Sequence, residues 1–275
     1  MHPMLNIAIR AARKAGNHIA KNYETPQNVV VTQKGSNDFV TNVDREAEQL
    51  IIEIIRKSYP DHTIITEEGG ELLGKDVALG AGLDCRAVGV IDPLDGTTNF
   101  TKRLPHFAVS IAVRIKGRTE VAAVYDPMRN ELFTAVRGQG SQLNGYRLRI
   151  AEKRDLEGAI VATGFPFKHK QHATPYMNVM SKMFEQCADF RRSGSAALDL
   201  CYVAAGRVDA YFEIGLKPWD FLGGELILRE AGGIMTDFIG GHNYLASGNL
   251  VAGSPRVVRD ILTVMKDELS EALKR

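Results

Sequence analysis

One segment of the chain alternates between two kinds of side chain, and this alternation constrains the fold more than any other feature. Every second residue of 107–116 is bulky and apolar, namely Phe107, Val109, Ile111, Val113 and Ile115. The residues between them face the other way, because successive side chains of a strand point to opposite sides. Gly117 turns the chain into residues 120–126, and Asp126-Pro127 turns it into residues 131–137. The pattern predicts an antiparallel meander of three strands.

Helices and further strands are predicted before this meander. Residues 1–22 place apolar side chains at helical spacing and charged ones on the opposite face, which indicates an amphipathic surface helix. A second helix is expected over residues 45–58, with Asp44 as its N-cap and Pro60 beyond its end. Short strands are expected at residues 63–66 and 87–91.

The predicted order of elements changes after about residue 150, where short strands alternate with helices. The strands are expected at residues 159–163, 188–191, 208–212, 234–237 and 250–252. The helices are expected at residues 195–205, at 221–231 before Gly232-Gly233, and from Ser254-Pro255 onward. Such alternation favours layered α/β packing. We expect an N-terminal α+β half (residues 1–150) and a C-terminal α/β half (residues 151–275) that form one compact unit, because no repeat or low-complexity linker separates them.

Composition narrows the classes of protein to which the chain can belong. Hydrophobic residues make up 44% and charged residues 24%, which excludes disorder, collagen and coiled coil. The formal net charge is +1, so the charge does not indicate direct nucleic-acid binding. Three widely spaced cysteines indicate reduced thiols rather than disulfides or a zinc site. We find no signal peptide and no apolar run long enough for a membrane span, and we expect a cytoplasmic protein.

The main candidate for a functional site is the segment IDPLDGTTNF at residues 91–100. Asp92 and Asp95 follow an apolar strand at a spacing that lets both face one cation, and the Leu94 carbonyl lies between them. Gly96 and Thr97 can open a short helix whose N–H groups hold an anion. Oxygen ligands beside an anion site indicate Mg²⁺ and a phosphate group. The alternative interpretation is an Asp-rich turn with a helix cap.

Other acidic residues support a metal site, although each also has an ordinary explanation. Glu67-Glu68 follows the expected strand at residues 63–66, but paired glutamates are usually solvated. Asp220 and Asp44 each precede a predicted helix, where an N-cap is the alternative role.

Together these motifs resemble the inositol monophosphatase family, in the family's order. The matching segments are residues 38–44, Glu67-Glu68, residues 92–100 and residues 219–233. The opening residues, residues 102–111 and residues 194–199 resemble its bacterial SuhB type. The resemblance implies a layered αβαβα sandwich of the sugar-phosphatase type. It also implies a lithium-sensitive, Mg²⁺-dependent phosphomonoesterase that forms a homodimer and binds two to three Mg²⁺ ions per site.

The resemblance also implies roles for individual residues. The first metal would be bound by Glu67, Asp92 and the Leu94 carbonyl, and the second by Asp92, Asp95 and Asp220. Glu67 would also bind a weaker third ion, and Glu68 would act through the water shell of the metals. Four carboxylates in one cleft cannot all stay ionised without cations, which supports this assignment independently.

The remaining implied roles concern water, phosphate and substrate. Thr97, hydrogen-bonded near Glu67 or Asp44, would orient the attacking water, so Thr97, Glu67 and Asp44 are the candidate catalytic residues. The amides of Gly96 and Thr97 would hold the phosphate. The positions that would contact the inositol ring are Gly194, Ala196 and Glu213. The alternative for Glu213 is a surface acid at the end of a strand.

The sequence departs from the family pattern at several positions. Gly69 stands where the family commonly has Ser, Gly89 stands where a bulky residue is usual, and Leu222-Gly223-Gly224 replaces an Ala-rich run. Residues 69–89 form a glycine-rich segment between two acidic motifs. This segment is either a flap over the site or a surface insertion.

The function predicted from these features is hydrolysis of myo-inositol 1-phosphate by metal-activated water. Fructose-1,6-bisphosphate and 3′-phosphoadenosine 5′-phosphate are alternative substrates, because phosphatases for both share the metal core. The resemblance to the SuhB type also implies a role in transcription antitermination, so a protein that binds RNA polymerase and Nus factors is the alternative from another class.

Overall fold

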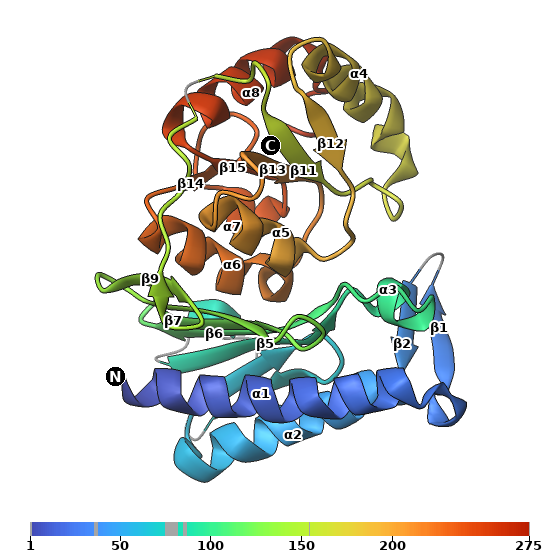
Figure 1. Ribbon diagram of the computed structural model, residues 1–275, viewed down its shortest axis with the longest axis vertical. Helices are drawn as coiled ribbons and strands as arrows, with labels where there is room; N and C mark the ends of the chain where they lie inside the picture. Colours follow the sequence, from blue (N-terminus) through green and yellow to red (C-terminus); the bar gives the residue numbers. More distant parts are fainter. Residues whose placement is uncertain (1, 36–37, 75–81, 85–86, 154, 275) are drawn as a thin grey trace.

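Two large sheets, of eight and five strands, alternate with three pairs of helices in the computed structural model, which gives five layers, and a separate two-stranded sheet lies at the edge (Figure 1). The structure describes residues 2–35, 38–74, 82–84, 87–153 and 155–274. The predicted layered αβαβα arrangement is confirmed. Within the described ranges, no helix is both long enough and apolar enough to span a bilayer.

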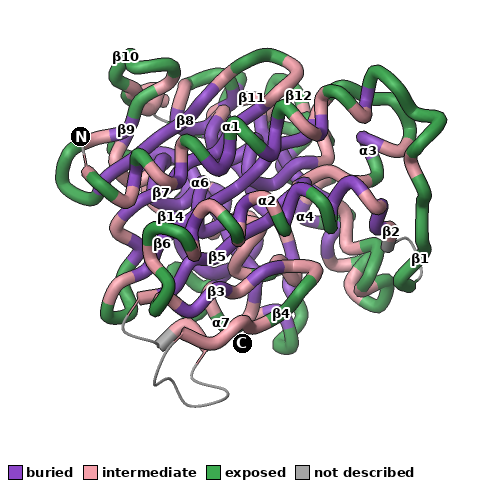
Figure 2. Tube along the Cα trace, turned by 90° about the horizontal axis from the view of Figure 1, so that it is seen from below, coloured by how far each residue is buried: buried purple, intermediate pink, exposed green. Residues whose placement is uncertain are grey.

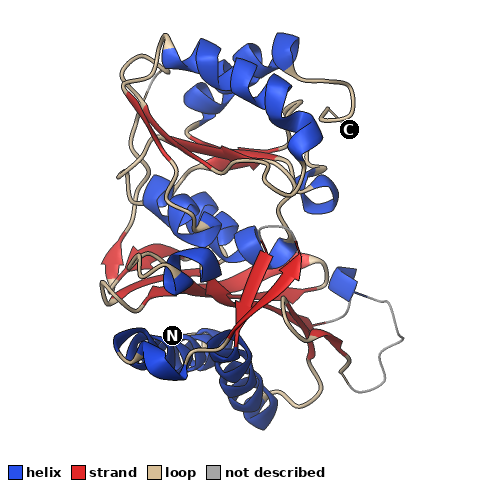
Figure 3. Cartoon of the chain, turned by 90° about the vertical axis from the view of Figure 1, so that its right-hand side faces the viewer, coloured by secondary structure: helices blue, strands red, loops and turns tan. Residues whose placement is uncertain are grey.

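The first layer consists of α1 (Pro3–Glu24) and α2 (Asn42–Ser58), which cover the outer face of the first sheet (Figures 1 and 3). Both helices are amphipathic, as predicted, and their buried faces pack on the bulky side chains of the meander. The predicted cap of α2 is wrong: Thr41 is the N-cap, and Asp44 lies in the first turn. Asp44 accepts a hydrogen bond from the Thr41 N–H at 2.9 Å, which completes a capping box.

The first sheet has eight strands in the order β10-β9-β8-β7-β6-β5-β3-β4. Their bounds are β3 Thr63–Thr66, β4 Gly70–Leu72, β5 Ala87–Asp95, β6 Ala108–Ile115, β7 Arg118–Asp126, β8 Glu131–Val136, β9 Gly140–Leu143 and β10 Tyr146–Arg147. The meander is β6, β7 and β8. Val109 and Ile111 face α1 and α2, whereas Ala108 and Ala112 face the middle layer, so helices cover both sides of β6.

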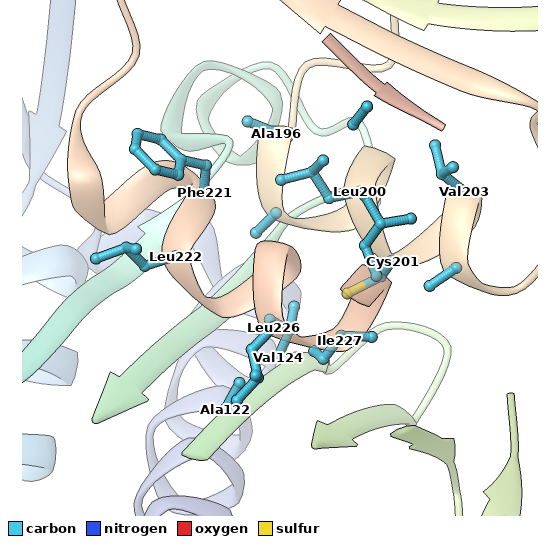
Figure 4. Packing of buried hydrophobic residues seen from close by; sticks show 14 of the residues in the cluster. Ala122, Val124, Ala196, Leu200, Cys201, Val203, Phe221, Leu222, Leu226 and Ile227 are labelled. Carbon is cyan, nitrogen blue, oxygen red and sulfur yellow. The ribbon is translucent and has the colours of Figure 1, made fainter. Parts of the chain in front are cut away.

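The middle layer consists of α5 (Ala196–Ala204) and α6 (Pro218–Glu230), which lie between the two sheets. Figure 4 shows their apolar side chains packed together and against Val124 of β7. Gly223 and Gly224 allow this close approach. A Cβ on Gly223 would lie 2.6 Å from the Ser110 Oγ atom, and one on Gly224 would lie 2.5 Å from the Cβ atom of Leu200.

The second sheet has five strands in the order β12-β11-β13-β15-β14. Their bounds are β11 Ile160–Thr163, β12 Asp189–Arg191, β13 Ala210–Glu213, β14 Ile234–Thr236 and β15 Leu250–Gly253. Its outer face is covered by α4 (Ala173–Phe184) and α8 (Pro255–Glu268). The predicted caps of this half hold: the Ser254 hydroxyl accepts from Val257 N–H, and Gly232 is left-handed with φ 99°. Helix α4 was not predicted.

Shorter elements complete the described part of the chain. They are β1 (Val31–Gly35), β2 (Asp38–Thr41), α3 (Thr97–Thr101), α7 (Tyr244–Ser247) and the 3₁₀ turns Pro26–Asn28, Gly82–Asp84 and Lys170–His172. Figure 2 shows the exposed strand β1 at the edge of the molecule. The glycine-rich segment contains β4 and one 3₁₀ turn. Its residues 75–81 and 85–86 lie outside the described residues, and the predicted flap lies partly there.

Candidate active site

A bulge in β5 directs both acids of the Asp92–Asp95 pair into one cavity. Asp92 lies opposite Ser110 of β6 and Asp95 lies opposite Ala108, so two residues of β5 face one residue of β6. Side chains three positions apart in a regular strand point to opposite faces. The extra residue reverses this parity, as β-bulges do. Pro93 lies inside the bulge, one of the few places in a sheet where proline is tolerated.

The paired glutamates at the end of β3 separate in the structure. β3 runs parallel to β5, and the N–H of Glu67 donates to the Ile91 carbonyl at 3.3 Å, so Glu67 lies beside the two aspartates. The Glu68 carboxylate instead forms an ion pair with Lys34 of β1. The backbone N–H of Glu68 donates to the Glu48 carboxylate at 3.1 Å.

Glu48 is a residue of this region that sequence analysis missed. It lies buried on α2, and burial raises the pKa of its carboxyl group. A Cβ on Gly69 would lie 2.7 Å from Glu48 Oε1, so Glu48 occupies the space that a side chain at position 69 would need. An acid between apolar positions of a predicted helix, here between Ala47 and Ile51, is the signal that could have found it.

The Thr97 hydroxyl connects α3 to α2. Its Oγ1 atom lies 2.9 Å from Asp44 Oδ1 and 3.0 Å from the Leu94 carbonyl oxygen. Thr41 donates to the other oxygen of Asp44 from its backbone N–H and its hydroxyl. Sequence analysis left open whether Thr97 bonds near Glu67 or Asp44, and the structure gives Asp44.

Asp95 joins the first sheet to the middle layer. Its Oδ2 atom accepts a hydrogen bond from Ser195 Oγ at 2.6 Å and from the Ala197 N–H at 2.7 Å, at the start of α5. Asn99 makes a second connection, because its side-chain amide donates to the carbonyls of His106 and Ser193 at 2.8 Å each. Neither connection was predicted from the sequence, since Ser195 lies 100 positions from Asp95 and Ser193 lies 94 positions from Asn99.

Asp220 reaches the site from α6. The helix begins at Pro218 with Lys217 as the N-cap residue, so the alternative role of Asp220 as an N-cap is wrong. Asp220 lies in the first turn, where its Oδ2 atom accepts from the Lys217 N–H at 2.6 Å. Helix packing therefore places this carboxylate opposite the acids of the first sheet.

Two adjoining cavities bring most of the predicted residues together. The acid cavity, of about 380 Å³, is lined by Glu67, Asp92, Leu94, Asp95, Gly96, Thr97, Gly194 and Asp220, among others. The Glu213 cavity, of about 500 Å³, shares Glu67, Asp95, Gly194 and Asp220 with it and adds Ala196, Asp199 and Glu213. Asp44 and Glu68 line neither cavity: Asp44 is hydrogen-bonded to Thr97, and Glu68 is paired with Lys34, which lines the Glu213 cavity. Arg192, Lys168 and Phe167 line both cavities and were not predicted.

Charge repulsion and burial act on the same carboxylates. Burial raises the pKa of Glu67 to about 7, with a further contribution from neighbouring acids that Lys34 opposes. Burial raises the pKa of Asp95 to about 6, against the hydrogen bonds from Ser195 and α5. The pKa values of Asp92 and Asp220 are also raised, first by burial and then by the other carboxylates. The cluster therefore holds more negative charge than its protein surroundings compensate.

The donor atoms of this cluster fit Mg²⁺. Every candidate ligand is an oxygen atom, from four carboxylates and the Leu94 carbonyl, and hard divalent cations prefer such ligands. Among the described residues, no three acidic, histidine or cysteine side chains already form a metal-binding group. Asp95 and Asp220 each direct one oxygen to a backbone N–H instead. The cavity therefore provides the right atoms and charge, and these side chains would adjust when cations bind.

Comparison with known proteins gives consistent results along the whole chain. The model of the "Inositol monophosphatase family" matches residues 1–269. The chain is 73% identical over 275 residues to "Nus factor SuhB" of Escherichia coli strain K12, covering 100% of both chains.

Solved structures agree with this result. The structure of the "extragenic suppressor protein suhB" from Bartonella henselae is 37% identical with a TM-score of 0.91, over 98% of this chain and 100% of that one. An inositol monophosphatase from Anabaena is 32% identical with a TM-score of 0.82, over 98% of this chain and 97% of that one.

Proposed function

This chain belongs to the inositol monophosphatase family, and on that basis we propose that it is a Mg²⁺-dependent phosphomonoesterase that hydrolyses myo-inositol 1-phosphate. The observation that carries the proposal is the meeting of Glu67, Asp92, Asp95 and Asp220 in one cavity beside Thr97. Bound Mg²⁺ would neutralise these carboxylates, lower the pKa of water and stabilise the departing alkoxide. The protein's own residues would position the water and the substrate and would accept the proton of the water.

We propose that the carboxylates divide between two main metal positions. Glu67, Asp92 and the Leu94 carbonyl would hold one ion, and Asp92, Asp95 and Asp220 would hold the other. The bulge in β5 supports this division, because it turns Asp92 and Asp95 toward the same cavity.

Thr97 and Asp44 would orient the attacking water and take its proton. A water molecule in the acid cavity would donate a hydrogen bond to Thr97 Oγ1, while the Thr97 hydroxyl donates to Asp44 Oδ1 at 2.9 Å. As the water oxygen attacks phosphorus, its proton moves to Thr97 Oγ1, and the Thr97 proton moves to Asp44. Asp44 is buried and held by Thr41, so its orientation is fixed before substrate arrives.

The substrate would lie across both cavities. Its phosphate would occupy the acid cavity near the amides of Gly96 and Thr97, and its ring would occupy the Glu213 cavity near Gly194 and Ala196. Glu213 would accept hydrogen bonds from hydroxyl groups of the ring, which favours a polyol. The scissile bond then lies where Asp95 and Asp220 border both cavities.

A phosphate-release assay over a panel of phosphomonoesters, with and without Mg²⁺, tests the proposal. We expect Mg²⁺-dependent release from myo-inositol 1-phosphate at a higher kcat/KM than from fructose 1,6-bisphosphate or 3′-phosphoadenosine 5′-phosphate. Preference for either alternative would correct the substrate, and absence of release from all of them would refute the phosphatase assignment.

A second function is favoured by the 73% identity to a Nus factor along the entire chain. We propose that this protein also binds RNA polymerase or Nus factors during antitermination, in the cytoplasm, and that it forms a homodimer as the family resemblance implies. The formal charge of +1 gives no support to direct nucleic-acid binding.

The two functions should be separable by experiment. An Asp95→Asn variant that stays folded should lose hydrolysis but keep partner binding in pull-down assays with purified RNA polymerase and Nus proteins. If the wild-type protein captures none of them, the binding role is refuted, whatever the result of the phosphatase assay.

A further inference from the structure

Gly164 lies where the Glu213 carboxylate would overlap any side chain. A Cβ on Gly164 would lie 2.0 Å from Glu213 Cδ, 2.0 Å from its Oε1 and 2.1 Å from its Oε2. The φ angle of Gly164 is outside the left-handed region, so its backbone would accept other residues. Glycine is therefore required here by the position of the carboxylate and not by a turn.

Strand pairing brings the two residues together. β11 and β13 are parallel with Thr163 opposite Phe212, so Gly164 and Glu213 follow at the same level. The Thr163 hydroxyl donates to the Phe212 carbonyl at 2.8 Å, which ties the two strand ends to each other. The pairing of β11 with β13 therefore sets the positions of the Gly164 Cα atom and the Glu213 side chain.

Two buried tyrosines hold this pair. The Tyr211 hydroxyl donates to the Glu213 carboxylate, and the Tyr176 hydroxyl donates to the Gly164 carbonyl. Both tyrosine side chains are almost fully buried, so their hydroxyl groups bond to these partners and not to solvent. Gly164 and Glu213 therefore occupy fixed positions on the wall of the Glu213 cavity.

We propose that Gly164 is a positioning residue for substrate selection. Its bare Cα leaves room for the Glu213 carboxylate to lie against the end of β11, bonded to Tyr211, and to keep the cavity open for the leaving alcohol. A methyl group at this position would push the carboxylate into the cavity and break its bond to Tyr211. This inference rests on the proposed function, because it assumes that Glu213 selects polyol leaving groups.

The test compares two substrates in the Mg²⁺-loaded enzyme: myo-inositol 1-phosphate, and p-nitrophenyl phosphate, which carries no hydroxyl groups. Gly164→Ala should lower the kcat/KM ratio of the first substrate to the second by about 10- to 100-fold, mainly through KM, as expected when hydrogen bonds to a charged group are lost. In a Glu213→Ala background the same change should alter the ratio by less than about twofold, because the two residues act as one unit.

Gly89→Ala is the matched control, since a Cβ there would lie no closer than 3.9 Å to its neighbours. It should leave the ratio unchanged. Tyr211→Phe removes the hydroxyl that holds Glu213 without adding volume, and it should lower the ratio in the same direction even if Gly164→Ala fails to fold.

Each result supports or overturns the inference. An unchanged ratio in Gly164→Ala or Tyr211→Phe overturns it, and so does an equal loss on both substrates or a full effect of Gly164→Ala without Glu213. Failure of the proposed function shows in the wild-type enzyme instead: activity on neither substrate, or on the aryl phosphate alone, refutes polyol hydrolysis and this inference with it.

Discussion

The first sheet contributes a cluster of carboxylates to the two adjoining cavities, whereas the second sheet contributes the Glu213 carboxylate and the loop that follows β11. On the first side, Asp92 and Asp95 come from a bulged strand and Glu67 from its parallel neighbour, and burial raises the pKa of each. On the second side, Glu213 lies at the end of β13 with Tyr211 beneath it. Under the proposed function, the first side would act on any phosphate ester, while the second side would meet only the leaving group.

We therefore expect the first side to bind the cations and the second side to select the substrate. Glu67 and Asp95 are exceptions, because both line the two cavities, and Asp95 also holds the start of α5 through Ser195 and Ala197. The boundary near residue 150 that the sequence suggests between two halves stays a prediction.

The largest expected effect comes from Asp95→Asn on the first side. Loss of one charge that stabilises the transition state typically lowers turnover about 10²- to 10³-fold, or about 2.7–4 kcal/mol. The loss should be similar on myo-inositol 1-phosphate and on p-nitrophenyl phosphate, and the Mg²⁺ requirement should rise. Turnover across a Mg²⁺ titration measures this, with the exposed Asp189→Asn as control. A folded variant within a few-fold of wild-type turnover would falsify the metal assignment.

Mg²⁺ should also stabilise the folded protein. Cations that bind only the native carboxylate cluster add about 2.7 kcal/mol to the free energy of unfolding at a hundred times their Kd. Thermal unfolding with increasing Mg²⁺, and again after chelation, measures the effect. The Asp95→Asn variant should gain less from Mg²⁺ and should be no less stable than wild type without it, because one repulsive charge is gone. A melting temperature that Mg²⁺ does not change would contradict the cluster's proposed role.

Glu213→Gln should have a smaller and selective effect on the second side. The amide keeps the shape but loses part of the capacity to accept hydroxyl hydrogens, so kcat/KM for myo-inositol 1-phosphate should fall about tenfold. The value for p-nitrophenyl phosphate should stay within about twofold. Steady-state kinetics on both substrates decide the matter, and equal losses would show that the two sides are not separate.

The smallest expected effect is on the stability of the fold, and it comes from the ion pair between Arg207 and Glu131. Arg207, which follows α5, donates to both carboxylate oxygens of Glu131 on β8 at 2.6 Å, and these hydrogen bonds lower the pKa of Glu131. A lowered pKa adds stability above the ordinary value of 4.5, and this stability is lost as the pH falls below it. Because the pair is partly exposed, we expect at most about 1 kcal/mol.

Urea unfolding of wild type and Glu131→Gln over a range of acidic to neutral pH measures this contribution. The two proteins should differ most near neutral pH and converge in acid, while the exposed Glu157→Gln should match wild type throughout. A difference that grows as the pH falls would show that the pair does not stabilise the fold.

Local patterns in the sequence were sufficient to predict many of the helices and strands. Alternation at residues 107–116 predicted β6, and helical spacing predicted α1 and α2, because one-sided burial leaves a period that can be counted. Ser254-Pro255 and Gly232 marked helix ends, since caps depend on neighbouring residues alone. The cap at Asp44 was wrong because Thr41, three residues earlier, forms a reciprocal capping box with it. Helix α4 escaped prediction, since only Tyr176, Val179 and Met183 of its residues are buried.

For the site, the sequence by itself determined which acids are present and the order in which they occur, and the motifs at residues 91–100 and around Asp220 were enough to indicate the chemistry. Only the tertiary structure decided how they meet. The bulge depends on pairing with β6, the anchoring of Asp95 depends on Ser195 a hundred residues away, and the place of Gly164 depends on the register of two parallel strands. These features arise from contacts between distant segments, and no local pattern of residues encodes the geometry of such contacts.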